Sequence, residues 1–147
     1  QIGAVLGPHE ASMLQRGMRT LYLRVERACR SAQMLAEALT DQPEISTVLY
    51  PGLPDFPGHD LARRQMSGGF GGMLSIRFSG GRARAVAAAA KLKLWLPATS
   101  LGGVDSLVEH RASIEGPGTP VPDDLLRLSV GIENAGDLLD DLLQAIG

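Results

Sequence analysis

The chain has 147 residues and a formal net charge of −2, so it is the size of one domain and can bury a hydrophobic core. This charge excludes the strongly basic surfaces of nucleic-acid-binding proteins, and no apolar run approaches the roughly 20 residues of a membrane-spanning helix. A single cysteine, Cys29, excludes an internal disulfide and favours the reducing cytoplasm. The chain lacks a signal-peptide pattern. Since it begins at Gln1 and not at a methionine, we expect it to be a piece of a longer protein.

The first third of the chain predicts a long helix followed by a short strand. Proline is favoured at the first position of a helix, so we expect the helix to begin at Pro8. Apolar residues three and four positions apart continue to about Leu39, and Gly17 is a weak point at which a bend is expected. Pro43 prevents continuation of the helix. Residues 45–50, which are rich in β-branched side chains, predict the strand.

The rest of the chain alternates strands with helices, after an irregular loop rich in proline and glycine at 51–58. This order predicts an α+β fold with a small, mostly antiparallel sheet and helices packed on one of its faces. The expected helices are 59–66, 82–92 and 134–146, the last capped by Asn134, and the expected strands are 72–78, 94–96, 107–110 and 126–132.

The predicted strand at 126–132 carries one arginine, Arg127, within an otherwise apolar segment. Side chains alternate between the two faces of a strand, so Ser129 and Gly131 share the face of Arg127 and leave room in front of it. A planar guanidinium suits bidentate binding of a carboxylate or phosphate. An ordinary salt-bridged or solvated arginine is the alternative. The opposite, apolar face carries Leu126, Leu128, Val130 and Ile132.

Other suggestive residues favour structural roles. The glycine-rich segment 67–72 precedes a strand and not a helix, so it predicts a backbone turn instead of a phosphate-binding loop. His9, His59 and His110 are too scattered to predict a metal site. Cys29 lies beside the apolar stripe of the long helix, which predicts a small buried hydrophobic residue and not a nucleophile.

Blocks along nearly the whole chain resemble the C-terminal part of the Cys/Met-metabolism, pyridoxal-phosphate-dependent enzymes, and they occur in that family's order. The family includes cystathionine γ-synthase, cystathionine γ- and β-lyases, methionine γ-lyase and homoserine-ester sulfhydrylases. The resemblance implies that residues 1–147 are the C-terminal domain of a transsulfuration enzyme, which catalyses γ-elimination or γ-replacement on sulfur amino acids or homoserine esters. The blocks are QRGMRTLYLRVER (15–27), YPGLPDFPGHDLARRQM (50–66), GGMLSI (71–76), SLGGVDSL (100–107) and LLRLSVGIE (125–133).

The resemblance also implies that the cofactor-binding domain lies outside this chain. Pyridoxal phosphate needs a lysine for its Schiff base, and the family's lysine lies in a larger N-terminal domain that precedes the segment matching Gln1. The chain contains only Lys91 and Lys93, which end a predicted helix where lysine favours solvent. We therefore expect the chain alone to be inactive. Family members are typically homotetramers, so a homo-oligomer is expected.

The site residues implied by the resemblance gather around Arg127. The family binds the α-carboxylate of its amino-acid substrate with this arginine, and the hydroxyl of Ser100 and the neighbouring backbone, up to Leu101, approach the same carboxylate. Thr99 departs from the pattern, since γ-synthases and γ-lyases often carry glutamate there and methionine γ-lyases often valine. The segment 110–122 lacks the family's Thr-His pair. Both departures put the choice of substrate in doubt, but not the reaction class.

Two alternatives remain open at the level of the sequence. The chain could be a stand-alone amino-acid-binding domain, in which Arg127 and Ser100 hold a carboxylate without chemistry. It could also be an oligomerisation domain, in which Arg127 pairs with an acidic residue across an interface.

Overall fold

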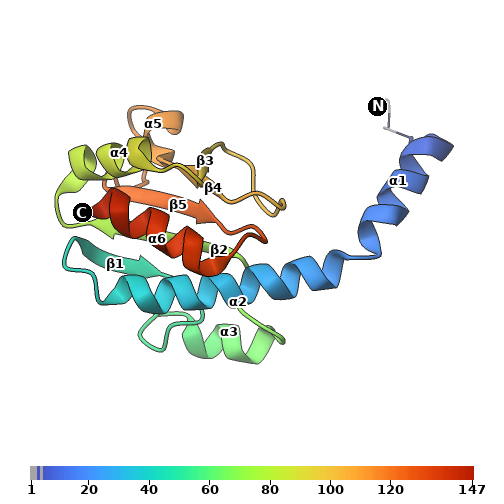
Figure 1. The fold of residues 1–147 in the computed structure, drawn as a ribbon, viewed down its shortest axis with the longest axis horizontal. Helices are drawn as coiled ribbons and strands as arrows, with labels where there is room; N and C mark the ends of the chain where they lie inside the picture. The colour runs from blue at the N-terminus through green and yellow to red at the C-terminus, as the bar shows by residue number, and fades with distance from the viewer. Residues whose placement is uncertain (1–2, 4) are drawn as a thin grey trace.

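The computed structural model describes residues 3 and 5–147 and has a five-stranded sheet in the order β1-β2-β5-β4-β3, with helices around it (Figure 1). Neighbouring strands are antiparallel except β3 and β4, which are parallel. The expected α+β class and mostly antiparallel sheet are confirmed. The strands are β1 (Ile45–Leu49), β2 (Met73–Phe78), β3 (Leu96–Pro97), β4 (Leu107–Glu109) and β5 (Leu125–Ser129). The helices are α1 (Pro8–Met18), α2 (Leu21–Thr40), α3 (His59–Gln65), α4 (Gly81–Lys91), α5 (Arg111–Glu115) and α6 (Ala135–Ile146).

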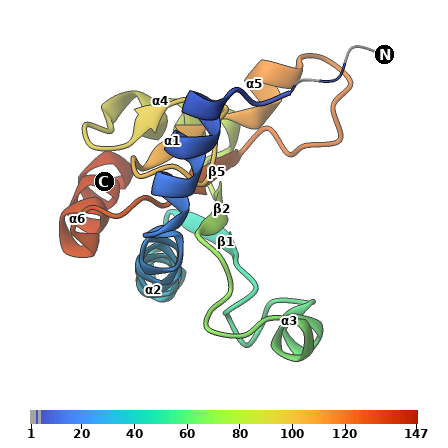
Figure 2. The ribbon, with the colours of Figure 1, turned by 90° about the vertical axis from the view of Figure 1, so that its right-hand side faces the viewer.

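The sheet has one apolar face and one polar face because side chains alternate along its central strands. Leu74 and Ile76 of β2 and Leu126 and Leu128 of β5 are buried on the apolar face. Helices α2, α4 and α6 pack on this face, and Figure 2 shows them on the same side of the strands. Arg127 lies on the opposite face and is half-buried. The predicted placement of the helices and of Arg127 is therefore confirmed.

The predicted long N-terminal helix is divided into two helices, so the expectation of one helix from Pro8 to Leu39 is wrong. Gly17 remains helical, and the break lies two residues later, between α1 and α2. The last carbonyls of a helix lack partners within it. Here the Arg24 side chain donates to the carbonyl of Gly17 at 2.7 Å and to the hydroxyl of Thr20 at 3.4 Å, which stabilises the break.

The strand that carries Arg127 is shorter than expected, and the space predicted beside Gly131 is filled. β5 ends at Ser129, because the N–H of Gly131 donates to the Ser106 hydroxyl at 2.9 Å and that of Ile132 to the carbonyl of Val104 at 2.9 Å. A Cβ on Gly131 would collide with the backbone of Val104 and Asp105. The glycine is therefore required because the loop that precedes β4 packs directly against it.

Two short elements also differ from the sequence-based expectations. The strand expected at 94–96 begins only at Leu96, because the N–H groups of Lys93 and Leu94 donate to the carboxylate of Asp141 on α6. Residues 111–115 form α5, a helix that was not among those expected from the sequence. An Arg111–Glu115 ion pair four residues apart supports this short helix.

The hydrophobic core lies between the apolar face of the sheet and helices α2, α4 and α6. Cys29 is buried, which confirms its expected role as a small hydrophobic residue. Asn134 caps α6, as its position predicts, because its side-chain oxygen accepts from the N–H groups of Gly136 and Asp137. The largest fully buried side chains include those of Tyr50, Phe78, Trp95, Leu35, Leu39, Leu138 and Leu142.

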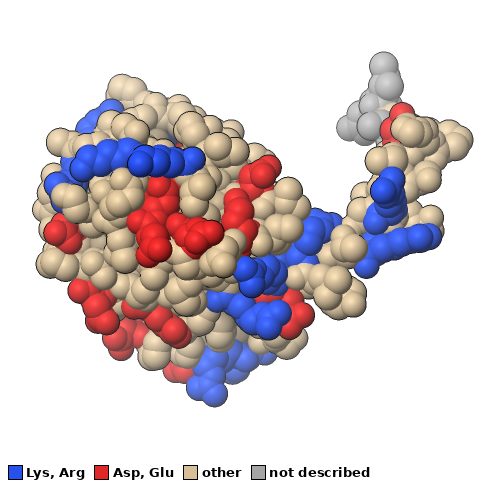
Figure 3. Space-filling view, in the orientation of Figure 1, with Lys and Arg blue, Asp and Glu red and all other residues tan. Residues whose placement is uncertain are grey.

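Helix α1 and the first turns of α2 form an arm that projects from the body of the molecule (Figure 1). Every residue of α1 is exposed, including the apolar Met13, Leu14 and Met18. Figure 3 shows Lys and Arg side chains along this arm, whereas acidic side chains gather on the body. Among the described residues, no helix is both long enough and apolar enough to cross a membrane.

Candidate functional site

Arg127 occupies the middle of β5 on the polar face of the sheet. It pairs in register with Ser75 of β2 on one side and with Glu109 of β4 on the other. Its side chain retains 19% of its exposure. The central strand therefore holds the base of the side chain rigidly, while the guanidinium reaches the edge of the sheet where β3 and β4 lie.

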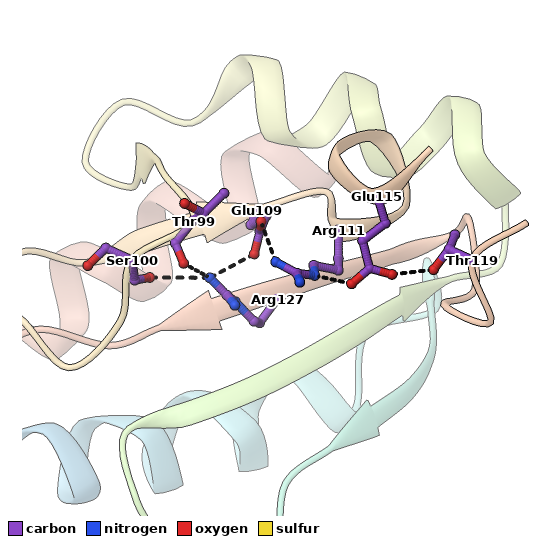
Figure 4. A network of polar contacts seen from close by, with 7 residues as sticks. All are labelled: Thr99, Ser100, Glu109, Arg111, Glu115, Thr119 and Arg127. Carbon is purple, nitrogen blue, oxygen red and sulfur yellow. Dashed lines mark hydrogen bonds and ion pairs between the residues drawn. The ribbon is translucent and has the colours of Figure 1, made fainter. Parts of the chain in front are cut away.

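The guanidinium of Arg127 is anchored through one of its nitrogens (Figure 4). Nη2 donates to the carbonyl oxygens of Thr99 at 2.7 Å and of Ser100 at 3.2 Å, and it lies 2.7 Å from Oε2 of Glu109. Nε is buried without a hydrogen-bond partner among the described residues. The hydrogen bonds and the ion pair that Arg127 makes with described residues thus all involve Nη2, and Nη1 takes part in none of them.

Glu109 is the functional-site residue that the sequence did not predict. Its side chain retains only 2% of its exposure and lies between two arginines, with Oε2 close to Arg127 and Oε1 3.3 Å from Nη1 of Arg111. A buried carboxylate requires such compensation. A charged residue within a predicted strand could have marked Glu109 as a candidate. Its place opposite Arg127, however, depends on the pairing of β4 with β5, which the local sequence does not specify.

The network continues from Glu109 into the segment that departs from the family pattern. Nε of Arg111 donates to Oε1 of Glu115 at 2.6 Å, and the hydroxyl of Thr119 donates to Oε2 of the same carboxylate. The Thr119 hydroxyl and the Arg111 guanidinium lower the pKa of the Glu115 carboxyl, and the hydrogen bonds that Arg111 donates to Glu115 and Glu109 raise the pKa of Arg111. One chain of polar contacts therefore connects the loop at Thr99 with Thr119 (Figure 4).

The predicted site residues come together only in part. Thr99 and Ser100 reach Arg127 through their backbone carbonyls, while their residues are exposed. Leu101 is also exposed, at 58%, and no hydrogen bond joins it to Arg127 within the described residues. Arg127 pairs with Glu109 of its own chain, so the alternative in which it requires an acidic partner across an interface loses its main motivation.

Residues that follow Arg127 hold the loop that carries Thr99 and Ser100. The hydroxyl of Ser129 accepts from the N–H of Gly102 at 3.0 Å. The carboxylate of Glu133 accepts from the N–H of Ser106 at 2.7 Å and from its hydroxyl at 2.8 Å. The segment 127–133 therefore contains Arg127 and also fixes the loop beside it.

The residues of this chain do not fit a complete pyridoxal phosphate site. Lys91 and Lys93 are exposed near the end of α4, so neither is enclosed in a site where a Schiff base would be protected. The glycine-rich segment 67–72 forms a turn packed on Cys29, since a Cβ on Gly69 would lie 2.8 Å from that of Cys29. The described residues also include no group of three or more His, Cys, Asp and Glu side chains able to hold a metal ion.

Comparison with known proteins places the whole chain in one family. Residues 1–147 match the family described as Cys/Met metabolism PLP-dependent enzyme. The chain is 53% identical over 150 residues to cystathionine gamma-synthase of Mycobacterium tuberculosis (strain ATCC 25618 / H37Rv), which covers 99% of the chain and 38% of that protein. It is 44% identical over 152 residues to L-methionine gamma-lyase of Pseudomonas putida, covering 98% of the chain and 38% of the relative.

A solved structure agrees with this assignment. The structure of O-acetylhomoserine sulfhydrylase from Wolinella succinogenes superposes with a TM-score of 0.92 at 34% identity and covers 99% of this chain and 40% of its own. The chain therefore spans about two fifths of the length of the relatives that it matches.

Proposed function

Because the chain belongs to the Cys/Met-metabolism, PLP-dependent enzymes, we propose that it is the C-terminal, substrate-carboxylate-binding domain of a transsulfuration enzyme. The enzyme is of the cystathionine γ-synthase or γ-lyase type and carries out γ-elimination or γ-replacement on a sulfur amino acid or a homoserine ester. The observation that carries the proposal is the rigidly held guanidinium of Arg127, which keeps Nη1 for a ligand beside the exposed Ser100.

The relatives give stronger support for the proposed reaction class than for any particular substrate. A synthase, a lyase and a sulfhydrylase all align with nearly the whole chain. Identity is higher with the mycobacterial cystathionine gamma-synthase, at 53%, than with the Pseudomonas methionine gamma-lyase, at 44%, so the synthase is the first substrate specificity to assay. We also propose that the enzyme works as a homo-oligomer, a tetramer as in its family, in the cytoplasm.

The contribution of this chain to the reaction is to bind and orient the substrate. Nη1 of Arg127 and the Ser100 hydroxyl hold the α-carboxylate, while Nη2 fixes the guanidinium to the loop at Thr99 and Ser100. Fixing one end of an amino acid in this way restricts the rotation of its Cα substituents, and such positioning can supply a large part of a rate enhancement. Pyridoxal phosphate, held by residues outside this chain, supplies the electron sink for the carbanion chemistry.

The proposal is tested by Arg127→Ala in the full-length enzyme. We expect a strongly raised KM and a lowered kcat, because losing a charge-assisted anchor that also orients the reacting bond costs about 2–5 kcal/mol. Arg127→Lys should recover only part of this loss, since an ammonium group does not reproduce the planar donor set of a guanidinium. Steady-state kinetics of Arg127→Ala equal to those of the unmodified enzyme would exclude the role.

A further inference from the structure

Glu109 is a buried carboxylate, and stability alone does not explain its presence at this position. A carboxylate with 2% exposure loses most of its hydration, and exchanging a buried ion pair for apolar residues of similar size is often neutral or stabilising. Glu109 also lies on the polar face of the sheet, while its neighbour Val108 is buried in the core. Apolar side chains at residues 109 and 127 together would therefore serve the fold equally well, so the fold itself does not require this ion pair.

The position of Glu109 relates it directly to Arg127. The two residues are cross-strand partners of β4 and β5, and such partners have Cβ atoms about 4.5–5.5 Å apart. Oε2 of Glu109 lies 2.7 Å from Nη2 of Arg127, the nitrogen that also donates to the carbonyls of Thr99 and Ser100. These three oxygens surround one nitrogen and determine how the guanidinium is placed (Figure 4).

Charge balance explains why Glu109 does not simply neutralise its partner. Its carboxylate is shared, because Oε1 lies 3.3 Å from Arg111 while Oε2 faces Arg127. Two arginines, Arg111 and Arg127, and two carboxylates, Glu109 and Glu115, form the network, so its formal charge is zero. With Glu109 shared between two cations, Arg127 keeps an attraction for a further anion.

We propose that Glu109 is a positioning residue for substrate binding, which holds Arg127 by Nη2 so that Nη1 remains for the substrate carboxylate. This inference rests on the proposed function of Arg127 and adds a second residue to it. It also connects the substrate carboxylate with the segment 110–122, whose Arg111 shares Glu109.

The test compares two ligands in the full-length holoenzyme. L-Norleucine is an amino acid without a γ leaving group, and L-norleucinamide replaces its carboxylate by a neutral amide. Inhibition constants for both are measured with the unmodified enzyme and with Glu109→Leu, which keeps the volume but removes the carboxylate. We expect Glu109→Leu to raise the inhibition constant of norleucine about tenfold, equivalent to about 1.4 kcal/mol, and to leave the inhibition constant of norleucinamide unchanged.

Two further variants complete the design. Glu109→Gln keeps the shape of the side chain but removes its ionic contact with Arg127, so it should weaken norleucine binding in the same direction as Glu109→Leu and leave norleucinamide binding unchanged. Glu115→Gln is the matched control at the outer end of the network, and it should bind both ligands normally. If Glu109→Leu fails to fold, Glu109→Met provides the same test with a more adaptable side chain.

The outcomes separate the two proposals. The positioning role of Glu109 would be overturned if Glu109→Leu bound norleucine as well as the unmodified enzyme does, or if it bound both ligands more weakly by the same factor. In either case the proposed function stands provided that Arg127→Ala loses the preference for norleucine over norleucinamide. If Arg127→Ala keeps that preference, the proposed function itself is wrong.

Discussion

Single residues after Arg127 determine whether the loop at 99–106 stays in place. Gly131 has no Cβ, so the backbone of Val104 and Asp105 can pack against it. Glu133 then binds both the N–H and the hydroxyl of Ser106. The carbonyls that hold Arg127 belong to the same loop, so these contacts stabilise the fold and the candidate site together.

Gly131→Ala should destabilise the chain by about 1–3 kcal/mol, because its Cβ would overlap backbone atoms that cannot move independently. Urea unfolding followed by circular dichroism measures the change. Gly103→Ala is the matched control in the same region, since the nearest atom to its Cβ is the N of Asp105 at 4.0 Å, and it should stay within about 0.5 kcal/mol. Equal stability of Gly131→Ala and the unmodified chain would contradict the packing described here.

Tyr50 makes the free energy of unfolding depend on pH in the alkaline range. Burial raises the pKa of its hydroxyl to about 12, with smaller contributions from Cys29 and Glu37, and the neutral hydroxyl donates to the carbonyl of Gly71 at 3.0 Å. Because the folded pKa lies above the ordinary value near 10, this contribution is complete below pH 10 and is lost as pH rises towards 12.

The measurement is the free energy of unfolding between pH 9 and 12 for the unmodified chain and Tyr50→Phe. The tyrosine adds a slope that approaches about 1.4 kcal/mol per pH unit in this window, so the unmodified chain should lose stability more steeply. Parallel pH profiles for the two proteins would show that the hydroxyl ionises as freely in the folded chain as in the unfolded one.

At the scale of the elements, local sequence patterns correctly predicted the features that depend on residues close by in the sequence. The alternation around Arg127 placed it correctly on the face opposite Leu126 and Leu128, and Asn134 was correctly expected to cap α6. The missed features depend on distant partners. Glu109 reaches Arg127 only because β4 pairs with β5, and β3 begins late because Asp141 of α6 binds the preceding N–H groups.

The cap of α6 is a direct test of the element that completes the core. Asn134→Ala should destabilise the chain by about 1 kcal/mol, because the N–H groups of Gly136 and Asp137 lose their acceptor. Asn134→Asp should retain most of the stability, since a carboxylate accepts the same bonds and interacts favourably with the helix dipole. Thermal unfolding measures both, and an alanine variant as stable as the aspartate variant would refute the capping role.

At the scale of the whole molecule, the proposed substrate-binding surface has no enclosed lysine beside it among the described residues. Lys91 and Lys93 are exposed, so they should form only weak, unselective Schiff bases with pyridoxal phosphate. After incubation with the cofactor and gel filtration, the 147-residue chain should show no aldimine absorption band. A retained band that shifts when an amino acid is added would show that the cofactor site lies within this chain.

The exposed arm formed by α1 and the start of α2 belongs to the same scale. Its apolar side chains, including Met13, Leu14 and Met18, are left uncovered by the body of the molecule. In the proposed full-length enzyme, further protein surface is available to cover them, either from the cofactor-binding part or from another subunit.

The most direct test of the account is a chimera in which this chain replaces the matching segment of the mycobacterial cystathionine gamma-synthase, 53% identical to it. Steady-state kinetics are measured with and without Arg127→Ala. The chimera should be active, and Arg127→Ala should raise its KM strongly and lower its kcat. A folded chimera that retains its cofactor and turns over substrate equally well with alanine at residue 127 would contradict the claim that this chain anchors the substrate carboxylate.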